Sequence, residues 1–163
     1  MKVSTLVVAL LLSGFARDAI AADRPYGPGV TDAEIKIGQT VPYSGPASAF
    51  SSYGRVMAGY FQMLNEKGGI NGRKVNLISL DNAFSPPKAL EQTRKLIESD
   101  GVLAEVGTVG TVPNVATQKY LNQNKIPQVF ISAGGRRFND PKNFPWTVPS
   151  LSLIHISEPT RPY

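Results

Sequence analysis

The order of elements between Glu34 and Asp81 constrains the fold most strongly. This segment reads as an apolar strand, a Ser-Gly-Pro loop, an amphipathic helix, a Gly-Gly-Ile-Asn-Gly-Arg turn and a second apolar strand. Residues 35–40 alternate with the period of a strand, and one helical face then follows at Val56, Tyr60, Met63 and Leu64. Two strands joined through a helix predict a parallel sheet, whose ligand cleft lies beyond the carboxyl ends of the strands.

Strand and helix signals continue to alternate after Asp81. The sequence predicts a helix that begins at Pro86-Pro87 and ends near Asp100, a strand over 102–106, a helix from Pro113 through Asn122, and a strand over 127–131. We therefore expect the α/β class, with a three-layer, doubly wound, mostly parallel sheet. The length of 163 residues and the hydrophobic content of 42% suit one globular domain.

Residues 1–21 have the features of a secretory signal peptide. Lys2 precedes an apolar run from Leu6 to Leu12, and Ala19-Ile20-Ala21 supplies the small residues of a cleavage site. The apolar run is far shorter than the roughly 20 residues that a membrane span needs. The chain contains no cysteine, which excludes disulfides, thiolate metal sites and a lipidated cysteine anchor. We predict a soluble protein exported to the periplasm, with residues 22–33 as a flexible lead-in to the domain.

The C-terminal residues 151–163 look foreign to the domain. The run from Leu151 to Arg161 resembles an in-frame translation of a transposase-adapter sequence used in preparing DNA sequencing libraries. The alternative is a natural strand over 151–156 followed by a proline-broken tail. The length of the match favours the adapter, so the expected domain covers residues 34–150. The only histidine, His155, lies in this tail.

The basic residues and the glycine motifs exclude several functions. The formal charge is +5, but the basic pairs are separated and lack interleaved aromatic residues, so we expect no nucleic-acid partner. Gly107 and Gly110 do not complete a dinucleotide-binding motif, and no phosphate loop of the Walker type is present. We expect no cofactor and no metal.

The carboxylates give no sign of catalysis. The candidates for acid–base chemistry, Asp81, Glu105 and Asp140, are scattered by the predicted topology. Asp81 follows a strand, where we expect it to cap or brace a loop. Glu105 lies within a strand, where we expect a satisfied buried or edge carboxylate. We predict that the protein is not an enzyme.

Three loops meet at one rim of the predicted sheet: residues 41–52, 107–112 and 132–137. The second loop leads into a helix amino terminus, whose unpaired amides favour an anionic group such as a carboxylate, and Thr108 and Thr111 add hydroxyl donors. The alternative is helix capping by Thr111 with no ligand. Phe50 and Tyr53 flank the first loop and form either an apolar wall for a ligand or ordinary packing.

These residues resemble the type I periplasmic solute-binding proteins that serve ABC importers of branched-chain amino acids and related small carboxylates, the leucine-binding-protein-like family. The resemblance runs from about Glu34 to Pro149. Its most specific motifs are Ser44-Gly45-Pro46, Gly68-Gly69-Ile70-Asn71-Gly72-Arg73-Lys74, Ser85-Pro86-Pro87-Lys88, Gln118-Lys119-Tyr120-Leu121 and Asp140-Pro141-Lys142-Asn143-Phe144-Pro145-Trp146.

The resemblance implies a receptor of two hinged lobes that closes on a ligand and docks on an ABC permease in the inner membrane. It places the carboxylate-binding hydroxyl at Thr108. With the apolar residues of the first rim loop, the ligand-binding set becomes Thr108, Val106, Gly107, Ser132, Ala133, Gly134, Phe50 and Tyr53. Only the first lobe is present, so the acidic residue that neutralises a ligand's ammonium group is missing.

The sequence departs from the family pattern in the third rim loop. Gly134 stands where amino-acid binders often have threonine, and Arg136 stands where close relatives are hydroxylated. A different carboxylate, including an aromatic acid, is therefore open as the ligand. Two other functions also remain: a ligand-sensing domain of a receptor or regulator, and an exported Rossmann-like enzyme. The lack of cysteine and of a phosphate loop disfavours the enzyme.

Overall fold

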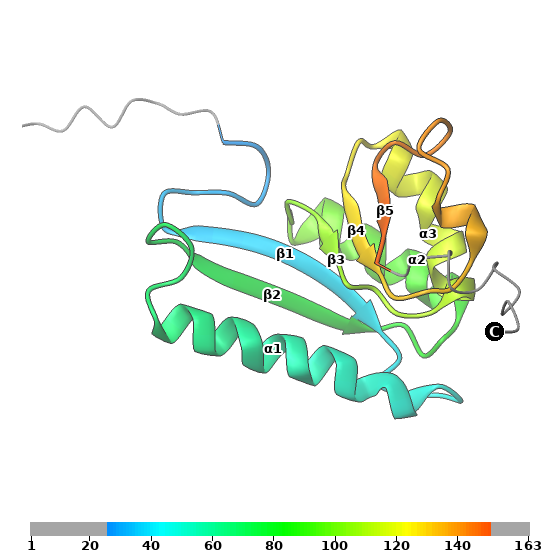
Figure 1. Ribbon diagram of the computed structural model, residues 1–163, viewed down its shortest axis with the longest axis horizontal. Helices are drawn as coiled ribbons and strands as arrows, with labels where there is room; N and C mark the ends of the chain where they lie inside the picture. Colours follow the sequence, from blue (N-terminus) through cyan, green and yellow to red (C-terminus); the bar gives the residue numbers. More distant parts are fainter. Residues whose placement is uncertain (1–25, 151–163) are drawn as a thin grey trace, which may run out of the picture.

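The sheet of this chain is entirely parallel. A computed structural model describes residues 26–150, in which five strands lie in the order β2-β1-β3-β4-β5 (Figure 1). The strands are β1 (Glu34–Val41), β2 (Lys74–Asp81), β3 (Glu105–Val106), β4 (Gln128–Ile131) and β5 (Thr147–Pro149). This arrangement confirms the predicted α/β class with a parallel sheet. The proposed signal peptide and the proposed adapter tail lie outside the described residues.

The helices fall close to the predicted positions. They are α1 (Ser51–Glu66), α2 (Pro86–Arg94) and α3 (Thr111–Gln123), with a π-helical turn η2 (Lys95–Ser99) and two short 3-10 turns, η1 (Ser48–Phe50) and η3 (Arg136–Phe138). The predicted strand over 102–106 is shorter in the structure, and β5 was not predicted.

Local contacts explain the turn between α1 and β2. Gly69 has a φ of +72°, and a Cβ there would lie 2.0 Å from the carbonyl oxygen of Arg73, so only glycine fits. Asn65, near the end of α1, donates to the carbonyl of Val75 and accepts from its N–H, each at 2.8 Å. The side chain of Asn65 thus ties the end of α1 to the start of β2.

The helices cover the two faces of the sheet unequally. The Gln39 side chain reaches Met57 of α1, whereas a Cβ at the neighbouring Gly38 would meet the side chain of Leu96 at 3.0 Å. Successive strand residues point to opposite faces, so α1 lies on one face and α2 with η2 on the other. The α2 helix packs against α3, which also covers β4. Figure 1 shows α1 alone beside β1 and β2.

The face that carries α1 is only partly covered. The predicted helix is confirmed, but its apolar stripe is exposed: Val56 is 71%, Tyr60 54% and Met63 42% accessible. The helix faces the sheet with other positions: Ser51 and Gly54 are buried, and Met57 contacts Gln39 of β1.

The sheet itself is also only partly covered on this side. A register-paired row of valines crosses β3, β4 and β5 at Val106, Val129 and Val148. Their strand neighbours Glu105 and Gln128 bond to the helices of the opposite face, so the valines point to the α1 side, where Val148 is 48% exposed. We call the stripe and the valine row together the open face.

The opposite face, under α2 and α3, is sealed, and we call it the closed face. Glu105 is fully buried there, and its Oε1 accepts a hydrogen bond from the Thr93 hydroxyl at 2.6 Å. Within residues 26–150 its Oε2 makes no hydrogen bond, and neither does Oε1 of Gln128, the residue directly across the ladder. Burial raises the pKa of Glu105 to about 7, against the lowering effect of the Thr93 bond. The prediction that the Glu105 carboxylate is buried or at an edge is confirmed by its burial, but the prediction that it is fully hydrogen-bonded is wrong, because only one of its two oxygens has a partner.

Candidate ligand-binding rim

The second and third rim loops lie side by side at the carboxyl ends of the strands. Val109 and Ser132 form a parallel bridge, the N–H of Ser132 donates to the carbonyl of Thr108 at 2.9 Å, and Gly110 donates to the carbonyl of Ser132 at 3.1 Å. This pairing confirms that loops 107–112 and 132–137 share one rim, as the topology predicted.

The amino terminus of α3 offers free donors at this rim. Within the described residues, the N–H groups of Thr111 and Val112 make no hydrogen bond, and neither do the hydroxyls of Thr111 and Ser132. The N-cap residue is Gly110, and no side chain caps the helix, which contradicts the alternative in which Thr111 is a cap. Amides at a helix amino terminus favour a negatively charged group, so these donors suit a carboxylate.

Thr108 does not present its hydroxyl to the rim. Its side chain is fully buried and donates to Oδ1 of Asn114, whose Nδ2 in turn donates to the carbonyl of Gly110 at 2.6 Å. This network shapes the loop that precedes α3. The hydroxyls left without a partner are those of Thr111, which was not in the predicted ligand-binding set, and of Ser132, which was.

The other predicted residues occupy different settings around the rim. Gly107 is held by its backbone, because its N–H donates to Val129 at 2.9 Å and its carbonyl accepts from Gln39 at 3.0 Å. Val106 lies on the open face, Ala133 is buried, and Gly134 is exposed. Sequence reasoning thus brought Gly107, Ser132, Ala133 and Gly134 together correctly, since they follow neighbouring strands.

The aromatic residues near the strand ends differ in what they contact. Phe50 and Tyr53, at the start of α1, are 57% and 38% exposed. Phe84, which sequence reasoning missed, packs its ring at Gly110, where a Cβ would lie 2.6 Å from ring atom Cε2. Both Ala83 and Phe84 have positive φ, at 48° and 57°, an unusual backbone for residues other than glycine. The local sequence contains no glycine or Asn-Gly pair that would predict this turn.

Asp81 braces the first rim loop, as predicted. Its carboxylate accepts from the N–H groups of Tyr43 and Ala83, both at 2.9 Å, and from the hydroxyl of Ser44. Lys88 completes the set with an ion pair at 2.7 Å. Burial acts to raise the pKa of Asp81, but these hydrogen bonds outweigh it and hold the pKa well below its usual range. The charge of Asp81 thus joins β2 to the Ser-Gly-Pro loop.

Two other kinds of site were sought in residues 26–150. This part of the chain gathers no group of three or more acidic or histidine side chains that could hold a metal ion. It also contains no helix long and apolar enough to cross a membrane.

Comparison with known proteins identifies what this fold and rim resemble. Residues 34–153 match the family model described as periplasmic binding protein. The "Leucine-, isoleucine-, valine-, threonine-, and alanine-binding protein" of Pseudomonas aeruginosa is 31% identical over 111 residues, which are 66% of this chain and 26% of that protein. The chain thus matches about a quarter of this relative's length.

Solved structures agree with this match. A possible leucine/isoleucine/valine-binding protein from Rhodopirellula baltica superposes with a TM-score of 0.62 at 25% identity, over 66% of this chain and 30% of that one. A fatty acid ABC transporter substrate-binding protein from Thermomonospora curvata gives 0.55 at 28% identity, over 63% and 26%. All three are binding proteins by name and not enzymes, and their named ligands differ.

Proposed function

We propose, because this chain belongs to the family of periplasmic binding proteins, that it forms the first lobe of the substrate-binding component of an ABC importer. The protein would work in the periplasm, bind a branched-chain amino acid or a related small carboxylate, and deliver it to a permease in the inner membrane. The relatives named for branched-chain amino acids and for fatty acids share a carboxylate in their ligands, which fits the donors at the rim.

The observation that carries this proposal is the set of free donors where α3 meets Ser132. The two unpaired amides of Thr111 and Val112 and the two unpaired hydroxyls of Thr111 and Ser132 lie on adjacent loops. A carboxylate has two oxygens that accept several hydrogen bonds each, so one group can satisfy donors from both loops. We propose Thr111 and Ser132 as the side chains that contact it, and Phe50, Tyr53 and Phe84 as the apolar border.

The open face supports the proposal that a longer protein completes this lobe. Val56 and Tyr60 are more than half exposed on α1, and the valine row lies bare beside that helix. A single chain rarely leaves so continuous an apolar surface in water. The segment that matches the P. aeruginosa relative covers 26% of that protein, so a protein of that relative's length would have room for a second lobe and for elements that cover this face.

Ligand-dependent melting tests the two-lobe proposal. The 163-residue chain should show no rise in melting temperature with micromolar leucine, because one lobe supplies only one wall of the cleft. A version extended beyond Ser150 by the continuing reading frame should be stabilised by about 2.7 kcal/mol at a ligand concentration of 100 times the Kd. A clear rise with the short chain, or a natural stop codon after Tyr163, would refute the proposal.

Substitutions in the extended protein test the donors. Thr111→Val and Ser132→Ala should each weaken leucine or fatty-acid binding by about tenfold, the cost of leaving a ligand oxygen without its hydrogen bond. Ser99→Ala, an exposed serine in η2, is the matched control and should leave affinity unchanged. Unchanged binding by both rim variants would show that the ligand lies elsewhere.

A further inference from the structure

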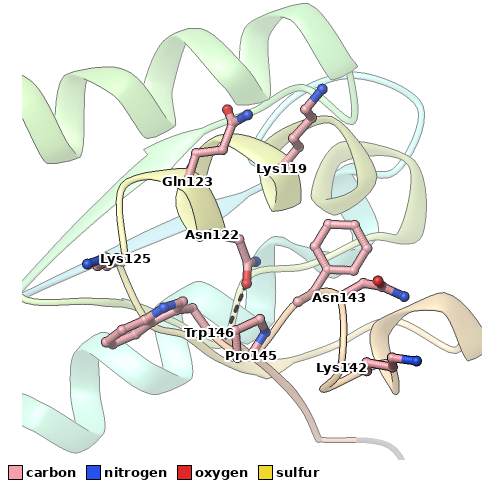
Figure 2. A pocket seen from close by; sticks show the side chains of 9 residues that line it. Lys119, Asn122, Gln123, Lys125, Lys142, Asn143, Pro145 and Trp146 are labelled. Carbon is pink, nitrogen blue, oxygen red and sulfur yellow. Dashed lines mark hydrogen bonds between the residues drawn. The ribbon is translucent and has the colours of Figure 1, made fainter.

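A second concave site lies at the end of the lobe opposite the rim. It is an open pocket of about 560 Å³ between the last turns of α3 and the loop that leads into β5 (Figure 2). Lys125 precedes β4 and Trp146 precedes β5, so the pocket borders the amino ends of these strands, whereas the rim lies at their carboxyl ends. Its volume falls within the range of small-molecule sites, about 300–1,000 Å³. The proposed importer function does not use it.

The floor of this pocket is rigidly built. Asn122 accepts a hydrogen bond from the N–H of Trp146 at 2.9 Å and donates to the hydroxyl of Thr147 at 2.7 Å. The carbonyl of Trp146 accepts from the N–H of Gln128 at 2.7 Å. Both sides of the Trp146 peptide are therefore held, and its partly exposed indole offers an apolar surface at the pocket (Figure 2). A backbone that is already ordered loses little entropy on binding.

The wall of the pocket is uniformly basic. Lys119 and Lys125 come from the end of α3 and the turn after it, and Lys142 comes from the loop before β5. All three lysines are exposed, and none of them is ion-paired to any carboxylate of residues 26–150. No acidic side chain lines the pocket. Three positive charges around a low-dielectric aromatic floor attract anions.

We propose that this pocket binds a small molecule in which a planar ring carries an anionic group. The ring would lie against Trp146, and the anionic group would pair with Lys119 and Lys142, whose exposed, flexible side chains can turn toward it from two different segments that line the pocket. Neither part is sufficient alone, because exposed ion pairs contribute little to affinity and stacking on the indole supplies the remainder.

Fluorescence of the chain tests this directly, because Trp146 is its only tryptophan. Three probes separate the two parts of the ligand. Adenosine monophosphate carries both a ring and an anionic group, adenosine carries the ring alone, and inorganic phosphate carries the anion alone. We expect saturable quenching by the monophosphate at submillimolar concentration, about tenfold weaker binding of adenosine, and loss of the difference at high salt, where surface charges are screened. Equal affinity for adenosine and its monophosphate, or no saturation below about 1 mM, would overturn the proposal.

Substitutions of the lysines locate the site. The double variant Lys119→Ala/Lys142→Ala should weaken the monophosphate by about tenfold, and it should fold normally because both side chains are exposed. Lys67→Ala, an exposed lysine after α1, is the control and should leave binding unchanged. If the control lowers affinity as much as the double variant, the binding is a general charge effect and the pocket is not the site.

Discussion

The two faces of the sheet are built on opposite principles. The closed face hides polar groups such as Glu105, Gln128 and Asn114 beneath α2 and α3, with no exposed surface to hydrate them. The open face shows the reverse, because apolar residues such as Val56 and Val148 remain in water. Burying polar groups without full pairing costs free energy, and exposing apolar groups forgoes a gain. The closed face is thus complete within this chain, whereas the open face is suited to a partner segment.

Shortening a side chain should lower the stability of the protein on the closed face but not on the open face. Leu96→Ala on the closed face should lower the free energy of unfolding by about 2–5 kcal/mol, because Leu96 is fully buried against the backbone at Gly38. Met63→Ala on the open face should change it by less than about 0.5 kcal/mol, because the side chain is 42% exposed. Urea unfolding of both variants measures the difference. Equal losses would mean that the open face is covered in solution.

The charge of Glu105 gives the next largest effect. The pKa of this carboxyl rises from 4.5 to about 7 in the folded chain, so the folded state binds the proton more tightly than the unfolded state. Stability is then fully present below pH 4.5 and falls as the pH rises to 7, by up to about 3 kcal/mol. Urea unfolding between pH 5 and about 8 follows this loss.

Glu105→Gln isolates this effect. The amide keeps the shape of the carboxyl but does not ionise, so the variant should lose the pH dependence and be more stable than the parent above pH 7. Glu91→Gln, an exposed residue of α2, is the control and should retain the parental profile. Asp81 does not interfere, because its pKa is lowered by folding, so its contribution to stability is lost only as the pH falls below 3.8, the ordinary pKa of an aspartate. If Glu105→Gln still loses stability as the pH rises from 5 to about 8, another group is responsible for the pH dependence.

The sequence predicted the fold because the spacing of apolar residues distinguishes helices from strands. Pro86-Pro87 and Gly69 also marked a helix start and a turn correctly. It did not recover which face of α1 packs on the sheet, because Val56 and Tyr60 form a good helical stripe that the described chain leaves uncovered. It missed β5 because a strand of three residues, the last of which is a proline, carries too little pattern.

Sequence reasoning placed two loops of the candidate site together correctly but not its single side chains, and ligand binding there stays a prediction. The strand order alone places Gly107 and Ser132 at one rim. Whether a threonine hydroxyl is available to a ligand depends on tertiary hydrogen bonds. The hydroxyl of Thr108 is not available, because it donates to the side chain of Asn114. The positive φ of Ala83 and Phe84 likewise follows from the contacts of Asp81 and Asn82 with that turn. Such contacts cannot be read from spacing.

The smallest expected change in stability concerns the open face itself. Val56→Lys should alter the free energy of unfolding by less than about 0.5 kcal/mol, since Val56 is 71% exposed and lysine favours a helix more than valine does. Its effect should appear in solution behaviour: a charge in the apolar stripe should lower self-association, measured by sedimentation velocity, relative to Gln62→Lys on the polar side of α1. In a two-lobed parent protein the same Val56→Lys change should instead destabilise the fold by about 1–3 kcal/mol, because the lysine would be buried by the covering segment. If Val56→Lys leaves the stability of both the short chain and the two-lobed protein unchanged, no segment covers the open face. The open face would then be exposed in the two-lobed protein as well.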